Sequence, residues 1–187
     1  MSSIKQKRSE FANRTFKITD LVKKIGKYKK EMEVIGNLEK LFKEKGKLDL
    51  LNSIKKAKNL EISESYEGLH FTIDGKKDSI TSYSGDKNQD WEDYSWFEEW
   101  FKQDFENLKK LKKLTYLSRF ASEVDNNFLN NFPQSLKVLT INNLNDLKEP
   151  LFQHLDKIET LDEEYDDEDN ENANLIQKYE DKIEFVG

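Results

Sequence analysis

Apolar residues recur along the chain with the spacing Leu-x-x-Leu-x-Ile. The pattern is clearest at Leu136, Leu139 and Ile141, and related sets occur at four other places. The central residues of the five units are separated by 54, 25, 19 and 25 residues. The last four units therefore fit a repeat with a period of roughly 20–29 residues. In chain order the units are Ala57, Leu60 and Ile62; Leu111, Leu114 and Tyr116; Leu136, Leu139 and Ile141; Leu155, Ile158 and Thr160; Glu180, Ile183 and Phe185.

Each unit predicts a short strand whose alternate side chains point inward. One such strand cannot bury its apolar side alone, so neighbouring units must stack before the array is stable. The competing interpretation is a set of unrelated strands and helices in a chain rich in Leu and Lys. We expect strands of one sheet, at least the last four parallel and in chain order, with helices on the other side, at residues 60–62, 114–116, 139–141, 158–160 and 183–185.

The segment from Phe132 to Ile141 reads Phe-Pro-Gln-Ser-Leu-Lys-Val-Leu-Thr-Ile. It resembles the repeat unit of bacterial and protist leucine-rich-repeat proteins, in which Leu-Pro-x-Ser-Leu-Lys-x-Leu-x-Ile is common. The resemblance is close over this unit and loose over residues 108–187, and it implies a short solenoid. That family usually has an Asn at the turn after the strand. The corresponding positions here hold Ser65, Arg119, Leu144 and Glu163. We therefore expect no asparagine ladder and an irregular array with caps.

The first 58 residues are predicted to be a helical N-terminal cap. Residues 1–18 suggest a short helix or capping segment, and Thr19 or Asp20 can cap a long amphipathic helix that ends at Gly46. Gly36 is a candidate break in this helix. A second helix is expected from Leu48 to Lys58. The apolar positions of the long helix step by four and three residues; they are Leu21, Ile25, Tyr28, Met32 and Ile35.

Residues 59–187 form the predicted repeat-like α/β region, and the two regions are expected to make one compact domain. A β-hairpin inserted at residues 69–83 has alternating apolar residues and an Asp74-Gly75 turn. An aromatic helix follows, with Phe97, Phe101, Phe105 and Leu108 on its core face. Four large rings lie to the side of that face or near the helix start, where some are expected to stay partly exposed; they are Trp91, Tyr94, Trp96 and Trp100.

Composition argues against most chemical functions. The chain has no Cys, only His70 and His154 as imidazoles, no Gly-rich phosphate loop and no His-Glu-x-x-His motif. We therefore expect no enzyme activity, no metal site and no cofactor. The acidic run after residue 161 lacks the Gly that a calcium loop requires. No signal peptide or apolar segment of membrane-spanning length is evident, so a cytoplasmic location is the simplest expectation.

Charge is divided along the sequence. Residues 1–60 hold 17 Lys and Arg against 7 Asp and Glu, whereas residues 61–187 hold 14 against 30. Residues 162–171 alone carry eight acids. The two halves could face each other, or each could attract a partner of opposite charge, or most charges could be a solvated surface. The best candidates for phosphate contacts are Lys23, Lys24, Lys27, Lys29 and Lys30, although this row has no Arg and no interleaved aromatic residue.

These observations favour a non-catalytic protein-binding module. The resemblance, together with a small, acidic, Cys-free chain, suggests an immunity or inhibitor protein that neutralises a basic protein partner such as a toxin. The alternative is a nucleic-acid-associated protein that uses the basic first 60 residues. The predicted partner site is the outward column of the strands with acidic and aromatic neighbours; it comprises Glu61, Thr115, Thr140, Glu159, Glu184, Asp162, Glu163, Asp166, Asp167, Trp91 and Tyr94. The column is expected to be flanked by Asn59, Lys113, Val138, Lys157 and Lys182.

Overall fold

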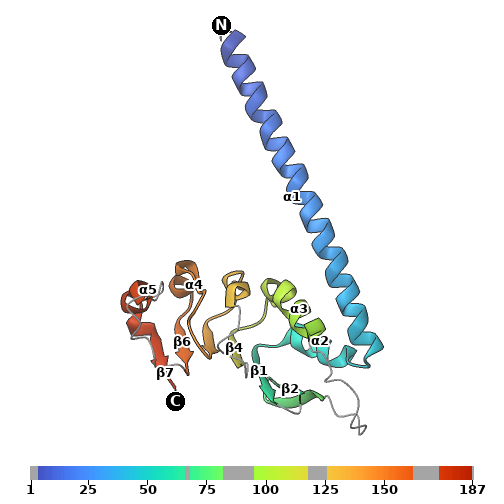
Figure 1. Ribbon diagram of the computed structural model, residues 1–187, viewed down its shortest axis with the longest axis vertical. Coiled ribbons are helices and arrows are strands. Elements are labelled where there is room, and N and C mark those ends of the chain that lie inside the picture. The colour runs from blue at the N-terminus through green and yellow to red at the C-terminus, as the bar shows by residue number, and fades with distance from the viewer. Residues whose placement is uncertain (1–3, 66–67, 82–94, 118–125, 162–172, 187) are drawn as a thin grey trace.

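The computed structural model describes residues 4–65, 68–81, 95–117, 126–161 and 173–186. The protein has an α/β fold with one open, mixed seven-stranded sheet of order β3-β2-β1-β4-β5-β6-β7 (Figure 1). Its strands are β1 (Asn59–Ser65), β2 (Gly68–Ile73), β3 (Lys76–Thr81), β4 (Lys113–Leu117), β5 (Val138–Ile141), β6 (Lys157–Thr160) and β7 (Ile183–Phe185). Its helices are α1 (Ile4–Glu44), α2 (Leu48–Lys56), α3 (Ser95–Asp104), α4 (Glu149–His154) and α5 (Ala173–Lys178), with 3-10 turns η1 (Phe105–Asn107), η3 (Asn126–Asn130) and η4 (Glu180–Lys182).

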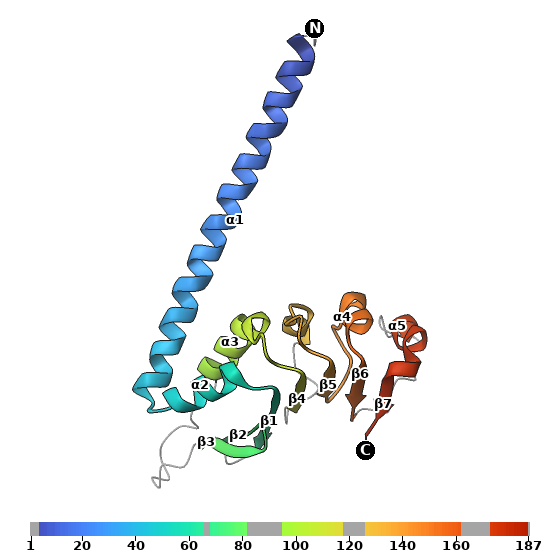
Figure 2. The same cartoon turned by 180° about the vertical axis from the view of Figure 1, so that it is seen from behind.

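Five strands pair in parallel and in chain order: β1, β4, β5, β6 and β7. Their register aligns one inward row, which consists of Leu60, Leu114, Leu139, Ile158 and Ile183. The first four members of this row are at most 2% exposed. Figures 1 and 2 show α3, α4 and α5 in a row along one side of the sheet. The predicted strands, their order and their parallel pairing are confirmed.

The hairpin extends the sheet beyond β1. β2 pairs antiparallel with both β1 and β3, and Leu69 and Phe71 are buried on the core side. Asp74 (φ 48°) and Gly75 (φ 85°) form the two-residue turn with left-handed backbone that this sequence favours. The Asp74 carboxylate also accepts hydrogen bonds from the backbone N–H groups of Lys58 (3.1 Å) and Asn59 (2.8 Å). The predicted hairpin is confirmed over its described residues, which end at Thr81.

The long helix differs from the prediction at its beginning. α1 starts at Ile4 instead of after Thr19 or Asp20, and it continues through Gly36. The residues before Thr19 include several lysines, which favour helix formation. The helix can therefore begin earlier, and neither Thr19 nor Asp20 acts as its N-cap. Gly36 also does not end the helix, because one glycine costs only about 1 kcal/mol in a helix interior. Of the α1 side chains that the structure describes, Leu38 and Phe42 are buried.

The aromatic helix is buried on two sides. Phe97, Phe101 and Phe105 are each at most 1% exposed, as the spacing predicts. Trp100, expected to the side of the core face, is fully buried, and Trp96 is partly buried against the core. The reason is Phe42 of α1, whose ring packs edge-on against Trp96 (4.9 Å between centroids) and Trp100 (5.0 Å). The end of α1 therefore covers the second side of α3.

A charged cluster joins the three helices at this junction. The Lys55 ammonium of α2 lies between Glu39 of α1 and Asp104 of α3, at 3.9 Å from the Asp104 carboxylate. Asp104 is only 6% exposed, and burial raises the pKa of its carboxyl, although hydrogen bonding from Asn107 and the charge of Lys55 act in the opposite direction. A buried carboxylate needs such a partner to remain charged.

Asparagine side chains bridge η3 and the segment that follows β5. Buried Asn126 donates through Nδ2 to the carbonyl O (3.3 Å) and Oδ1 (3.0 Å) of Asn143 and to the carbonyl O of Asn145 (3.3 Å). At the other end of η3, Asn130 donates to Asp146 O and accepts from Lys148 N, both at 2.8 Å. The bridge joins two units through Asn126 and Asn143 and is not a ladder through successive repeats, so the expectation about the ladder stays a prediction.

The end of α1 generates the first prediction. Gly46 (φ 69°) follows the helix, and the N–H groups of Gly46 and Lys47 donate to the carbonyls of Lys43 (3.1 Å) and Phe42 (2.7 Å), which is the Schellman arrangement. Replacing Gly46 with Ala forces a side chain into left-handed backbone, so we expect a loss of about 1 kcal/mol in the free energy of unfolding. Urea unfolding monitored by circular dichroism measures it.

Gly26→Ala is the matched control, because Gly26 lies within α1 and nothing lies within 4 Å of a Cβ built there. This substitution should leave stability unchanged or raise it by up to about 1 kcal/mol. Equal effects of the two substitutions would contradict the assigned helix end.

Candidate protein-binding surface

The outward column predicted from the sequence is present in the sheet. Parallel pairing places Glu61 beside Thr115, Thr115 beside Thr140, Thr140 beside Glu159, and Glu159 beside Glu184. Glu61 and Glu184 at the two ends are exposed, Thr115 and Glu159 are half-buried, and Thr140 is buried. One row of side chains therefore crosses five strands on the side of the sheet away from Leu60 and its neighbours.

The centre of this column is a network of hydrogen bonds and ion pairs. The Glu159 carboxylate accepts a hydrogen bond from Thr140 Oγ1 (2.6 Å). It also lies 2.9 Å from the Lys157 ammonium and 3.6 Å from that of Lys113, two strands away. The Lys157 ammonium pairs in turn with Glu184. The network thus connects β4, β5, β6 and β7 across the outer side of the sheet.

This network fixes the charge states of its members. The hydrogen bonds from Thr140 and Lys157 hold the pKa of the Glu159 carboxyl below its ordinary value, against the opposing effect of burial. Its bonds to Glu184 and Glu159 raise the pKa of Lys157. Glu159 and Lys157 therefore face each other as a charged pair near neutral pH.

The outer side of the sheet is balanced in charge among the described residues. Strand register places three lysines there, Lys77, Lys113 and Lys157, and three carboxylates, Glu61, Glu159 and Glu184. The ion pairs of Glu159 and Glu184 weaken the field that these two groups exert on an approaching molecule. Glu61, at the other end of the column, is exposed.

The row that flanks the column follows the prediction at four of five positions. Asn59, Lys113, Val138 and Lys157 are aligned by the pairing of β1, β4, β5 and β6. Lys182 is different, because it lies in η4 before β7 begins. Its ammonium donates to three carbonyls at the end of α4, those of Phe152 (3.1 Å), Gln153 (3.1 Å) and Leu155 (2.8 Å). Lys182 thus stabilises a helix C-terminus instead of contributing to the outer side.

Six predicted site residues cannot be placed. The aromatic candidates Trp91 and Tyr94 lie outside the described residues, as do the acidic candidates. The latter are Asp162, Glu163, Asp166 and Asp167. Their contribution to the surface stays a prediction.

The hairpin adds residues to this surface that the sequence reasoning did not include. His70 and Thr72 of β2 lie opposite Ser63 and Glu61 of β1, and therefore on the same side of the sheet. The His70 imidazole Nε2 is 2.7 Å from Ser65 Oγ. Antiparallel pairing of β1 with β2 was the missing information, since the hairpin sequence does not reveal which strand it joins.

The Ser65–His70 contact links the two strands β1 and β2. Nucleophilic catalysis would need, besides such a pair, a third group that orients the imidazole and donors for the developing oxyanion. In the described part of the chain, no group of three or more His, Asp or Glu side chains could hold a metal ion.

Comparison of the chain with known protein families, curated proteins and solved structures found no match. The surface therefore has to be interpreted from its own geometry. Within the described residues, no helix combines the length and the apolar character needed to cross a membrane.

Glu159 supplies a test of the network. Glu159→Gln removes a carboxylate that is stabilised in the folded state, and we expect a loss of about 1 kcal/mol in the free energy of unfolding at pH 7. Because the folded pKa of this carboxyl is lowered, its contribution is present above the ordinary value of 4.5 and is lost as pH falls through the folded pKa. The difference between variant and wild type should therefore shrink below pH 4.5.

Urea unfolding of both proteins between pH 7 and about pH 3 measures the effect. Glu180→Gln, an exposed carboxylate in η4, serves as the control and should have little effect at any of these pH values. A difference for Glu159→Gln that stays constant over the range would contradict the network.

Proposed function

We propose that this chain is a non-catalytic protein-binding module of the short leucine-rich-repeat-like type, and that it binds a protein through the outer side of its sheet. The observation that carries the proposal is the aligned column from Glu61 to Glu184 on five parallel strands. Stacked repeat units present such rows as extended binding surfaces. The resemblance of residues 132–141 to a leucine-rich repeat unit supports the same conclusion.

The surface has the mixed character of a protein interface. Its half-buried apolar residues, Val138 and Leu117, lie among hydroxyl groups and ion pairs. The ordered network around Glu159 offers groups of both signs in fixed positions, which suits specificity. A protein partner can match this pattern better than a uniform polyanion, because the described strands present as many carboxylates as lysines on this side.

We further propose that the partner is basic and that binding inhibits it, as an immunity protein inhibits a toxin. Support comes from the chain's charge, since residues 61–187 hold 30 acids against 14 bases. Eight of these acids follow directly after β6 in the sequence, at residues 162–171. Long-range attraction of this kind speeds association and weakens with salt.

The product of the reading frame next to this gene is the first partner to test. We expect the two purified proteins to form a complex, and surface plasmon resonance measures its affinity. Thr115→Arg should abolish measurable binding, because it places a large cation in the column. Glu61→Lys combined with Glu184→Lys should slow association by about tenfold at low salt, and less at physiological salt. Glu159 is left intact in these variants, so that its contacts with Thr140, Lys113 and Lys157 remain, whereas Glu184→Lys gives up the ion pair with Lys157.

Asn174→Arg, an exposed position in α5, is the control and should bind like the wild type. Circular dichroism must show an intact fold for each variant. Unchanged affinity and association rate for the column variants would exclude the outer side of the sheet.

A second candidate function is nucleic-acid association through α1. Figure 1 shows this part of the helix away from the sheet. The lysines of its basic row are exposed; they are Lys23, Lys24, Lys27, Lys29 and Lys30. We expect no retention of labelled DNA or RNA in a shift assay at physiological salt, about 0.15 M, because residues 61–187 carry a large excess of negative charge. Tight retention that falls steeply with added salt would favour this candidate over the first.

A further inference from the structure

Apolar residues follow a seven-residue repeat along α1. Ile4, Phe11, Ile18, Ile25 and Met32 are each seven positions apart, and a second row three positions later comprises Leu21, Tyr28, Ile35 and Phe42. Two rows with this spacing place their residues along one stripe of a helix, which is the pattern of helices that pack against another helix over a long distance. We call the part from Ile18 to Ile35 the seam.

The apolar stripe is covered near the C-terminal end of α1, whereas Ile25 and Met32 of the seam are exposed. Phe42 is fully buried against α3, and Ile35 is partly buried. Ile25 and Met32 are 58% and 70% exposed. Figures 1 and 2 show α1 leaving the body of the protein, and none of the other described helices and strands lies beside its N-terminal half. Apolar side chains repeated along an exposed stripe mark a site where another molecule binds.

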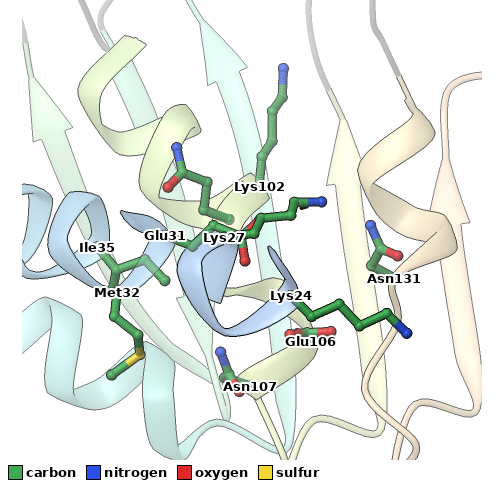
Figure 3. A pocket seen from close by; sticks show the side chains of 10 residues that line it. Lys24, Lys27, Glu31, Met32, Ile35, Lys102, Glu106, Asn107 and Asn131 are labelled. Carbon is green, nitrogen blue, oxygen red and sulfur yellow. Dashed lines mark ion pairs between the residues drawn. The ribbon is translucent and has the colours of Figure 1, made fainter. Parts of the chain in front are cut away.

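A groove continues the seam into the body of the protein. It lies between α1 and the segment formed by α3 and η1, and its volume is about 660 Å³. Figure 3 shows Met32 and Ile35 of the seam on one wall and Lys102, Glu106 and Asn107 opposite. Because two seam residues line the groove, a helix that packs on the seam has its end in the groove.

The charges beside the seam favour an acidic occupant. Lys24 precedes Ile25 and Lys29 follows Tyr28, so these two exposed lysines flank the apolar stripe. Three lysines, Lys24, Lys27 and Lys102, line the groove with two carboxylates, Glu31 and Glu106. Glu31 already lies 3.6 Å from the Lys27 ammonium. Residues 4–34 hold ten Lys and Arg against four Asp and Glu. Carboxylates at the flanking positions of a partner helix would complement this stripe.

A second copy of α1 fits the seam poorly. In a parallel pair aligned in register, Lys24 lies beside Lys29 of the other copy, and the last turns of the second helix occupy the place of α3. In either direction two copies would also bring together segments of like charge, since residues 4–34 hold ten Lys and Arg against four Asp and Glu.

We propose that the seam and its groove bind an acidic amphipathic helix of another protein. The seam spans 18 residues from Ile18 to Ile35, so the bound helix would be roughly 27 Å long. It would present apolar residues every three and four positions, with Asp or Glu on both flanks and its end in the groove. This is a second binding surface, separate from the outer side of the sheet and opposite to it in charge preference.

The test uses the full-length protein and a synthetic peptide of three heptads with Ile and Leu at the apolar positions and Glu at the flanking positions. Fluorescence anisotropy of the labelled peptide measures binding. We expect saturable binding that weakens by about tenfold or more when Ile25 and Met32 are both replaced by Asp. Lys24→Glu with Lys29→Glu should weaken binding of this peptide and strengthen binding of a peptide with Lys at the flanking positions.

Val34→Asp is the matched control. Val34 is an exposed apolar residue of α1 (38%) that lies off the seam, so this variant should bind like the wild type. Circular dichroism must show unchanged helix content in each variant. Binding of a partner to the outer side of the sheet, around Thr115, should be unaffected by the α1 variants, and this result would separate the two surfaces.

Three outcomes would overturn the proposal. They are failure of the wild-type protein to bind the acidic peptide, equal binding of the peptide with Lys flanks, and binding that the double Asp variant does not weaken. Analytical ultracentrifugation of the protein alone provides a fourth, since self-association that Ile25→Asp abolishes would assign the seam to a second copy.

Discussion

Contact between neighbouring members of the inward row is the interaction on which the rest of the structure depends. Leu60, Leu114, Leu139 and Ile158 lie side by side on parallel strands, and each is almost completely buried. Full burial of one such side chain contributes roughly 1.5–3 kcal/mol, and no single strand supplies its own neighbours. Because the register of this inward row also fixes the outward row, the same contacts place Thr140 beside Glu159 and create the candidate binding surface.

Much of the sheet could be predicted from local spacing. The Leu-x-x-Leu-x-Ile pattern located five strands, since inward residues of stacked repeat units must be apolar at the same relative positions. The Asp74-Gly75 pair located the hairpin turn, because few dipeptides accept left-handed backbone at two successive positions. These features depend on residues close together in the sequence.

Features that depend on distant residues could not be predicted in this way. Trp100 is buried because Phe42, far away in the chain, packs against its ring. The sequence alone suggested an acidic surface along the column. Its central carboxylate, Glu159, instead pairs with Lys113 and Lys157, and these pairs depend on how far side chains reach across the strands. The bridging role of Asn126 likewise became visible only when the turns of two units were placed together.

The protein thus carries two surfaces of different character. The outer side of the sheet is ordered by ion pairs and hydrogen bonds, whereas α1 offers an apolar stripe flanked by lysines. Because α1 packs on α2 and α3 and its exposed stripe lies away from the outer side of the sheet, changes on one surface should leave the other intact.

The most direct test of the strand register is disulfide formation between strands β6 and β7. The chain contains no Cys, so Glu159→Cys with Glu184→Cys creates the protein's sole thiol pair. These positions are directly paired on the same side of the sheet, within the reach of a disulfide, and oxidation should give an intramolecular bond detectable by mass spectrometry. Glu61→Cys with Glu184→Cys, whose positions are separated by three intervening strands, should give none. A disulfide in the second pair and not in the first would contradict the aligned column.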